Sequence, residues 1–238
     1  MQIPFFYISQ YSSSDTITRL DEDTSRHIVQ VLRMKKRDAL HLTDGKGNLF
    51  TASIEDDHKK HCTVRITHSE YIAPPSRHLA IGISPLKNNS RFEWFLEKAT
   101  ELGINEIIPV LCNRTERQKF RTDRMNTILV SAMLQSRQTW LPILHEPIGY
   151  ELLFAQHEVV NSAQKFIAHC IDSEKRNLTD LINESLQSQI ILIGPEGDFT
   201  AGEVEFAINN HFIPVALGDT RLRSETAGVA AAVLMRLV

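Results

Sequence analysis

Charged side chains gather at two glycine-bearing turns near the end of this sequence. Glu196 lies in the first turn, and the second carries Arg221, Arg223 and Glu225. Carboxylates exchange protons with reacting groups, and the guanidinium fork of arginine holds negative charge. Open α/β sheets bind ligands at the turns that follow their parallel strands. Two such turns, both with carboxylates and one with two arginines, therefore predict a functional site.

Each turn follows a short apolar run, as expected after a buried parallel strand. Ile190–Ile193 precedes Gly194-Pro195-Glu196-Gly197, and Val215–Leu217 precedes Gly218. The first turn lacks the Lys-Ser/Thr of a P-loop and does not match the glycine pattern of dinucleotide sites. Alternatively, the first turn is only a tight βα connection, and the charges of the second form a solvated edge.

The elements that must position these turns alternate between strand and helix from Leu79 onward. Apolar runs predict strands, and apolar residues at helical spacing predict helices. The expected strands are 79–84, 107–111, 166–171, 190–193 and 212–217, and the expected helices are 92–102, 125–133, 178–186, 200–208 and 224–237. The small residues of Thr226–Ala232 reflect helix propensity or permit close approach of another backbone, at a dimer interface or against a threaded loop. The alternation predicts an α/β domain with a parallel sheet covered on both faces.

The chain before this alternation has the pattern of a small β domain. Runs rich in β-branched and aromatic residues recur at 16–18, 40–43, 49–54 and 62–67. The glycines of Asp44–Asn48 suit a hairpin turn between the second and third of these runs. One helix is expected from Asp23 to Met34, with Thr24 or Ser25 as its N-cap. Ala73–Ser76, with two consecutive prolines, reads as a linker.

Composition restricts the class of protein. The chain has 238 residues, a net charge of −3 and three widely spaced cysteines without CxxC or a nearby histidine pair. We therefore expect reduced thiols, no zinc or other metal site, and any basic binding surface to be local. No run approaches a membrane span, and the first residues lack the pattern of a signal peptide. We expect a cytoplasmic protein without membrane contact.

Together the two turns resemble a known family. Gly-Pro-Glu-Gly-x-Phe followed by Leu-Gly-x-x-x-Leu-Arg-x-Glu-Thr-Ala is similar to the cofactor loops of the small-subunit (16S) ribosomal RNA uridine-N3 methyltransferases, in the SPOUT superfamily. The resemblance covers nearly the whole chain. Weaker matches, in the correct order, are His27-Ile28-x-x-Val31-Leu32-Arg33, Asp44-Gly45-x-Gly47, Lys98-Ala99-Thr100-Glu101-Leu102-Gly103 and Gln135-Ser136. Asp198, Leu134 and Thr220-Arg221 depart from the family pattern.

The resemblance implies a fold, a cofactor and partners. Residues 1–72 would form a PUA-like β-barrel that binds RNA, and residues 73–238 a SPOUT-type α/β domain with a C-terminal trefoil knot. The knot loops would bind S-adenosylmethionine in a homodimer, and the substrate would be ribosomal RNA in the assembled small subunit. The cofactor-binding residues implied are Leu192, Gly194, Glu196, Gly197, Leu217, Gly218, Leu222, Arg223, Thr226 and Ala227.

The chemistry that the resemblance implies can be assigned to three side chains. Methylation of uridine N3 requires removal of a weakly acidic proton, and Arg223 is the candidate that stabilises the resulting negative charge. Glu196 or Glu225 acts as the base, binds cofactor hydroxyls, or caps the last helix. Two alternatives stay open: another SPOUT RNA methyltransferase that modifies the ribose 2′-oxygen, and a non-catalytic RNA-binding protein of the same fold.

RNA contact requires positive charge, which gathers in two clusters. One stands at the end of the N-terminal helix and the other after the strand 107–111. The candidate RNA-binding residues are Arg33, Lys35, Lys36, Arg114, Arg117 and Arg121. The alternative for either cluster is a solvated face. Phe120 would stack on a base or serve as a buried anchor, and His27 is interpreted as a structural histidine.

Overall fold

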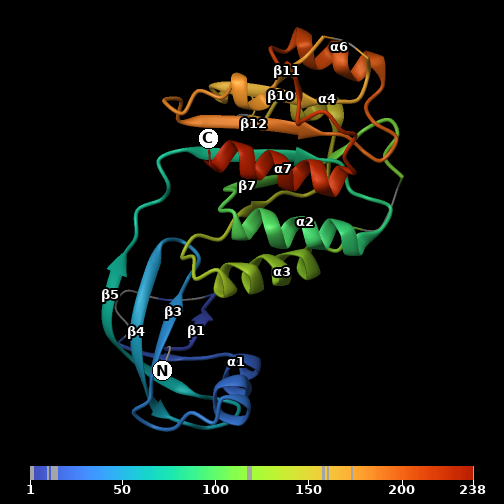
Figure 1. Ribbon diagram of the computed structural model, residues 1–238. Helices are drawn as coiled ribbons and strands as arrows, with labels where there is room; N and C mark the ends of the chain where they lie inside the picture. The colour runs from blue at the N-terminus through green and yellow to red at the C-terminus, as the bar shows by residue number, and fades with distance from the viewer. Residues whose placement is uncertain are drawn as a thin grey trace. The chain divides into compact units, whose positions relative to one another are not determined.

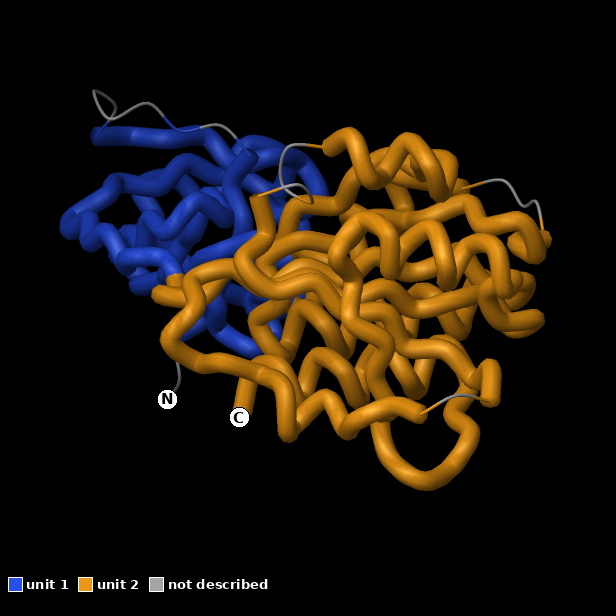
Figure 2. The backbone as a smooth tube through the Cα atoms, turned by 90° about the horizontal axis from the view of Figure 1, so that it is seen from above, with its two compact units in different colours: residues 1–74, 133–141 blue, residues 75–132, 142–238 orange. Residues whose placement is uncertain are grey.

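The computed structural model describes residues 3–9, 11, 16–116, 120–156, 159, 161–172 and 174–237. The chain divides into two compact units, which Figure 2 colours separately. Unit 1 consists of residues 1–74 and 133–141, and unit 2 of residues 75–132 and 142–238. Because residues 133–141 return to unit 1, the first unit is not continuous in sequence.

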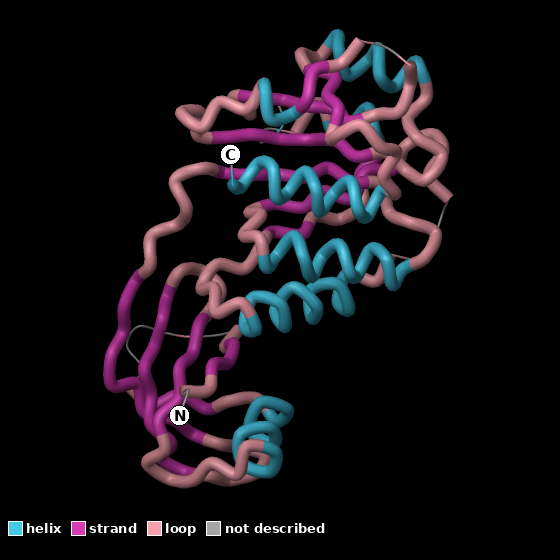
Figure 3. The backbone as a smooth tube through the Cα atoms, viewed as in Figure 1, coloured by secondary structure: helices cyan, strands magenta, loops and turns pink. Residues whose placement is uncertain are grey.

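Unit 1 is built on a five-stranded sheet. Its strands, in spatial order, are β1 (Phe5–Tyr7), β3 (Ala39–Thr43), β4 (Asn48–Asp56), β5 (Thr63–Tyr71) and β2 (Ile17–Arg19) (Figure 3). β1 pairs in parallel with β3, and the other pairs are antiparallel. Register shifts between Thr51 and Ala52 and between Ile54 and Asp56 interrupt the β4–β5 ladder, and such irregularities bend a sheet. The expected β domain is present, with β1 as a strand that the sequence patterns did not indicate.

The helix expected from Asp23 to Met34 is shorter and differently capped. An α-helix, α1 (Glu22–Arg26), continues as one π-helical segment, η1 (His27–Val31). Its N-cap is Asp21, whose Oδ1 accepts a hydrogen bond from the Thr24 backbone N–H at 2.8 Å, rather than Thr24 or Ser25. Ser25 is buried, and its hydroxyl accepts a bond from the Cys62 N–H at 3.0 Å. Its side chain therefore ties the helix to the sheet instead of capping it.

The turn between β3 and β4 explains why residues 133–141 belong to unit 1. Gly45 and Gly47 have φ of +69° and +92°, as the expected hairpin turn requires. A Cβ on Gly47 would lie 2.6 Å from Cζ2 of Trp140, so only glycine lets the indole pack here. The indole N–H of Trp140 donates to the Ile72 carbonyl at 3.0 Å.

Unit 2 contains an eight-stranded, fully parallel sheet (Figure 1). Its strands, in spatial order, are β11 (Arg176–Asn177), β13 (Ile213–Ala216), β10 (Gln164–Ala168), β12 (Ser188–Ile193), β6 (His78–Ile83), β7 (Glu106–Leu111) and β8 (Ile143–Leu144), and β9 (Ile148–Gly149) also pairs with β7. The three strands β13, β10 and β12 are neighbours, so the loops after them meet at one edge of the sheet.

Helices cover both faces of this sheet. α4 (Tyr150–Leu153) and α6 (Ala201–Asn209) share a buried core with one set of strand residues, including Ile190 and Leu192. α2 (Asn89–Glu101) and α7 (Ser224–Leu237) lie side by side, and α7 also packs on β6 and β12 (Figure 1). A Cβ on Gly228 of α7 would lie only 2.6 Å from Phe95 of α2. The small residues of α7 therefore serve close packing within this chain. α3 (Thr122–Gln135) runs from unit 2 into unit 1.

The helix expected over 178–186 is wrong. Only Leu178–Asp180 is helical, as one 3₁₀ turn, η2. Side chains bind the backbone beyond it: Gln164 donates to the Leu181 carbonyl at 2.8 Å and accepts from the Asn183 N–H at 2.9 Å. These bonds compete with a helical hydrogen-bond ladder. The short elements β8, β9, β11 and α4 were also not expected, because each is too brief to show a periodic pattern.

Candidate active site

A cavity of about 610 Å³ opens where three loops of unit 2 meet. These loops follow β10, β12 and β13, at the carboxyl ends of neighbouring parallel strands. We call it the loop cavity, and its volume is within the range of small-ligand sites. The two glycine-bearing turns supply two of its three walls, so strands that are distant in sequence bring Glu196 and Arg223 to one site.

The loop cavity contains most of the cofactor-binding residues expected from the sequence. Those in its lining are Gly194, Glu196, Leu217, Gly218, Leu222, Arg223 and Ala227. Three lie elsewhere. Leu192 is buried in the sheet core on the α4–α6 face, Gly197 packs against the side chain of Arg114, and Thr226 lines a second, smaller cavity. Their positions assign Leu192 and Gly197 to packing of the strand and the loop rather than to the cavity wall.

The glycines of the two turns serve different purposes. Gly218 has a φ of +127°, and a Cβ at this position would meet no atom within 4 Å. Its missing side chain thus leaves open space at the cavity wall. A Cβ on Gly194, by contrast, would lie 3.0 Å from the ring of Phe199, and one on Gly197 would lie 3.3 Å from Cδ of Arg114. Gly194 and Gly197 let the turn pack against its own neighbours.

Carboxylates hold the loop after β12 in place. Glu196 Oε1 accepts the backbone N–H of Lys87 at 3.1 Å, which ties this loop to the one after β6. Asp198 has a φ of +64°, in the left-handed region that Asp tolerates better than most residues. It accepts the N–H groups of Phe199 and Cys170, each at 2.8 Å. Asp198 can therefore replace the glycine of the family pattern and also join two walls of the cavity.

The third wall, after β10, was missed by reasoning from the sequence. It contributes His169, Cys170 and Lys175. His169 is buried, and its Nε2 has no hydrogen-bond partner among the described residues. Burial lowers the pKa of His169, and the charge of Lys175 lowers it further. A neutral imidazole with a free nitrogen is thus available to a polar ligand. The strand before this loop was expected, but only its place beside β12 and β13 shows that the loop belongs to the site.

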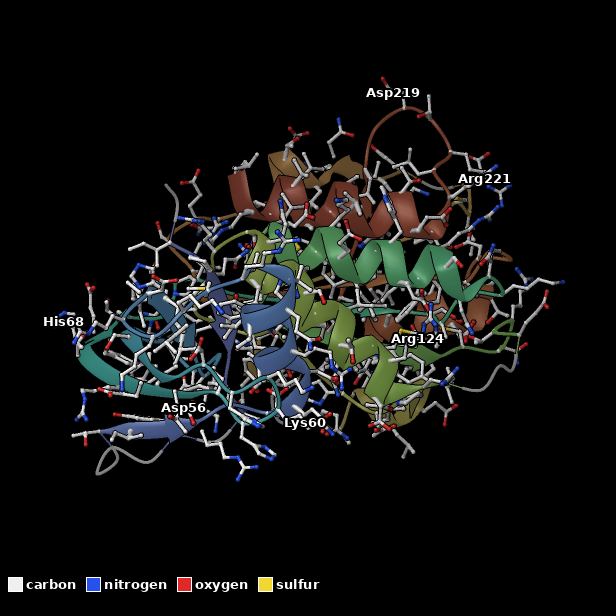
Figure 4. All side chains as sticks on the ribbon, turned by 90° about the horizontal axis from the view of Figure 1, so that it is seen from below. Asp56, Lys60, His68, Arg124, Asp219 and Arg221 are labelled. Carbon is white, nitrogen blue, oxygen red and sulfur yellow. The ribbon has the colours of Figure 1, made fainter. Side chains whose placement is uncertain are left out.

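Arg223 and Glu225 lie at the start of α7 in different environments. Arg223 is exposed and lines both the loop cavity and the smaller one. Glu225 is buried, with Oε1 at 3.6 Å from Nε of Arg91 in α2. Arg221 and Asp219 stand on the exposed loop before α7, as Figure 4 shows. The arginine that the family motif places at 223, rather than Arg221, thus connects the two cavities.

Comparisons with known proteins identify the family. Residues 73–236 match a model described as an RNA methyltransferase domain, and residues 20–67 match an RNA methyltransferase PUA domain. A ribosomal RNA small subunit methyltransferase E from Synechocystis is 32% identical over 86% of this chain and 68% of its own. The chain belongs to this methyltransferase family.

Solved structures agree with this assignment for the methyltransferase. A probable rRNA methyltransferase from Porphyromonas gingivalis is 35% identical, with a TM-score of 0.88 over 97% of this chain and 95% of that one. A ribosomal RNA small subunit methyltransferase E from Neisseria gonorrhoeae, bound to S-adenosyl methionine, is 28% identical, with a TM-score of 0.86 over 98% and 97%. The expected fold class is confirmed: a SPOUT-type parallel α/β sheet accompanied by a small PUA β-domain.

The candidate RNA-binding cations of the methyltransferase differ in their surroundings. Arg33, Lys35 and Lys36 are exposed in unit 1, beside the buried anchor Met34. Lys35 lies 3.6 Å from Asp57, in an exposed pair that retains little net attraction in water. The three side chains are thus exposed on one short segment that follows η1.

In the second cluster of the methyltransferase, two of the described arginines are engaged in their own unit. Arg114 donates to the Gly197 carbonyl at 2.7 Å, and Arg124 forms two bonds to Glu93, at 2.5 and 2.8 Å. Phe120 is half-buried and packs edge-on against Phe92, which favours the anchor alternative over a fully exposed stacking ring. Arg121 is exposed, whereas Arg117 lies outside the described residues.

Two further findings concern what the described residues can hold. They contain no group of three or more His, Cys, Asp or Glu side chains that is arranged to bind a metal ion. Among them, no helix is long and apolar enough to cross a membrane.

Proposed function

We propose that this methyltransferase transfers a methyl group from S-adenosylmethionine to N3 of a uridine in small-subunit ribosomal RNA. The observation that carries the proposal is the loop cavity, because both family motifs line it and Arg223 stands at its edge. The site fits the cofactor in two ways. Open space faces Gly218, and the unpartnered nitrogen of His169 is available to a polar group of the cofactor. The bound cofactor would supply an activated, positively charged methyl group.

The residues of the chain would do the remaining work. Gly194, Leu217, Gly218, Leu222 and Ala227 would bind the cofactor through backbone groups and small or apolar surfaces. Arg223 would stabilise the negative charge that develops on uracil when its N3 proton leaves. Glu196 contacts the Lys87 backbone, which favours a loop-holding role, and the buried Glu225 is the better candidate for the base.

RNA binding is assigned to unit 1 in this proposal. Residues 1–72 would serve as the RNA-binding domain and residues 73–238 as the catalytic domain, with Arg33, Lys35 and Lys36 on phosphates. Arg121 and Arg117 would add contacts from the second cluster, whereas Arg114 would chiefly hold the cofactor loop. The enzyme would act as a homodimer in the cytoplasm, on the assembled subunit.

The test is nucleoside mass spectrometry of small-subunit RNA from a strain that lacks the gene. We expect 3-methyluridine to disappear and to return with the wild-type gene but not with the Arg223→Ala variant. Loss of a ribose-methylated nucleoside instead would point to the 2′-oxygen reaction. An unchanged nucleoside profile would favour a non-catalytic RNA-binding protein. Purified enzyme would then be tested on unmethylated subunits and on protein-free RNA, with the subunits expected to be the better substrate.

A further inference from the structure

A second cavity, of about 330 Å³, lies between the start of α2 and the start of α7. We call it the α2–α7 cavity; its lining consists of Ser90, Arg91, Trp94, Arg223, Glu225 and Thr226. Arg223 lines this cavity and the loop cavity alike. A ligand in the smaller cavity would therefore meet the proposed cofactor site at the guanidinium group of Arg223.

The lining combines a buried acceptor with an exposed aromatic surface. Glu225 is 6% exposed, and its Oε2 has no hydrogen-bond partner among the described residues. A buried acceptor without a partner is costly, so the site is matched to a ligand that brings a donor. Trp94 is 43% exposed although it is a large apolar side chain. Flat π-surfaces of this kind stack on nucleic-acid bases.

The geometry points to the α2–α7 cavity as the pocket that receives the target uracil base, an assignment that rests on the proposed function. Trp94 stacks on the ring, and Oε2 of Glu225 accepts the N3–H. Arg91 and Arg223 donate to the two carbonyl oxygens that flank N3. Cytosine is rejected, because its N3 carries a lone pair rather than a proton and would face the carboxylate.

The same arrangement accounts for every atom of the transfer. Glu225 Oε2 takes the N3 proton, and the electron pair left on N3 forms the new bond to the methyl carbon. The bond between that carbon and the cofactor sulfur breaks, and its electron pair stays on sulfur. After the proton has left and before the methyl group arrives, negative charge spreads to the uracil oxygens. Arg223, at the junction of the two cavities, offsets that charge. Glu225 then releases its proton to water.

The first test is methyl transfer to unmethylated small subunits by Trp94 variants. Losing a base–aromatic stack weakens base binding by about 5- to 150-fold. We expect a loss of this size in kcat/KM for Trp94→Ala, and a much smaller loss for Trp94→Phe, which keeps a stacking ring. Affinity for S-adenosylmethionine, measured by calorimetry, should stay unchanged in both variants. Equal kcat/KM for wild type and Trp94→Ala would overturn the assignment.

The second test does not depend on catalysis. The chain has two tryptophans, so Trp94 is the single indole reporter in a Trp140→Phe background. Without cofactor, oligouridylate should quench its fluorescence more strongly than oligocytidylate of the same length. Replacing Glu225 by Gln should reduce that preference, because a neutral amide repels the cytosine N3 less than a carboxylate. No quenching, or equal quenching by both oligomers, would refute uracil capture at this cavity.

The two proposals fail in distinguishable ways. If the wild-type enzyme forms no 3-methyluridine on the subunits, the proposed function is wrong whatever Trp94 does. If the wild type forms it and Trp94→Ala does so equally well, the function stands and only the pocket assignment falls.

Discussion

The packing of α7 against α2 leads to a prediction about Gly228. A Cβ added at this position would lie 2.6 and 2.7 Å from Cε2 and Cδ2 of Phe95, and 3.1 Å from Cδ1 of Ile83. Both neighbours are 0% exposed, so neither ring nor branch can turn toward solvent. The contacts are far inside ordinary carbon–carbon separations, and Gly228→Ala must push α7 away from α2.

Two opposing effects set the size of the loss. Overpacking a tight core costs about 1–3 kcal/mol, and contacts this short place the variant near the upper end. Replacing glycine by alanine within a helix contributes about 1 kcal/mol in the other direction. We therefore expect Gly228→Ala to lower the free energy of unfolding by about 2 kcal/mol and Tm by about 4 to 8 °C. Urea titration and thermal unfolding followed by circular dichroism measure both quantities.

Gly202 in α6 provides a matched control. It is also a helical glycine, but a Cβ there would meet no atom within 4 Å. Gly202→Ala should therefore raise the free energy of unfolding, by about 0.4–1 kcal/mol. The two identical substitutions should thus shift stability in opposite directions. A Gly228→Ala variant as stable as wild type would show that α7 does not pack on Phe95 as described.

The site leads to three further predictions. Gly218→Val should fold but bind S-adenosylmethionine far more weakly in calorimetry, because its branched side chain would occupy the open space at the wall of the loop cavity, where the backbone φ is +127°. Unchanged affinity would place the cofactor elsewhere. Neutralising Arg33, Lys35 and Lys36 in unit 1 should weaken RNA binding and flatten its salt dependence in filter binding, since fewer counterions are released. A variant that keeps the full salt slope would argue against phosphate contacts at these residues. Burial raises the pKa of the Cys62 thiol to about 11, whereas Cys170 is exposed at the loop cavity. A thiol reagent should therefore label Cys170 first, and S-adenosylmethionine should slow that labelling. Equal labelling rates with and without the cofactor would contradict this prediction.

Local pattern alone was enough to locate the strands that carry the two motifs. Ile190–Ile193 and Val215–Ala216 are strands because runs of buried apolar residues before a glycine have few other conformations open to them. Thr200 and Glu203 likewise form the capping box that their spacing indicated, with both of its reciprocal hydrogen bonds present. These features depend on residues close together in the chain, and the sequence determines them directly.

The tertiary structure decided which loops share a cavity. His169 and Lys175 come to the site because β10 pairs between β12 and β13, and strand order is not encoded in any local period. Trp140 joins unit 1 through its contact with Gly47, across a long separation in sequence. The helix expected over 178–186 failed for a related reason, since Gln164 captures the backbone of that segment from a distant strand.

The sequence by itself determined the chemistry available, namely Arg223, Glu225 and glycine at 218 within recognisable motifs. It could not separate the roles of those residues, because burial and partners are properties of the packed chain. Only the fold buries Glu225 with one free oxygen, exposes Arg223 between two cavities, and places the Phe199 ring where a side chain at position 194 would lie. Residue type determines which chemistry a side chain can perform. Long-range contacts exclude water and bring distant loops together, and they determine at which site the side chain performs that chemistry.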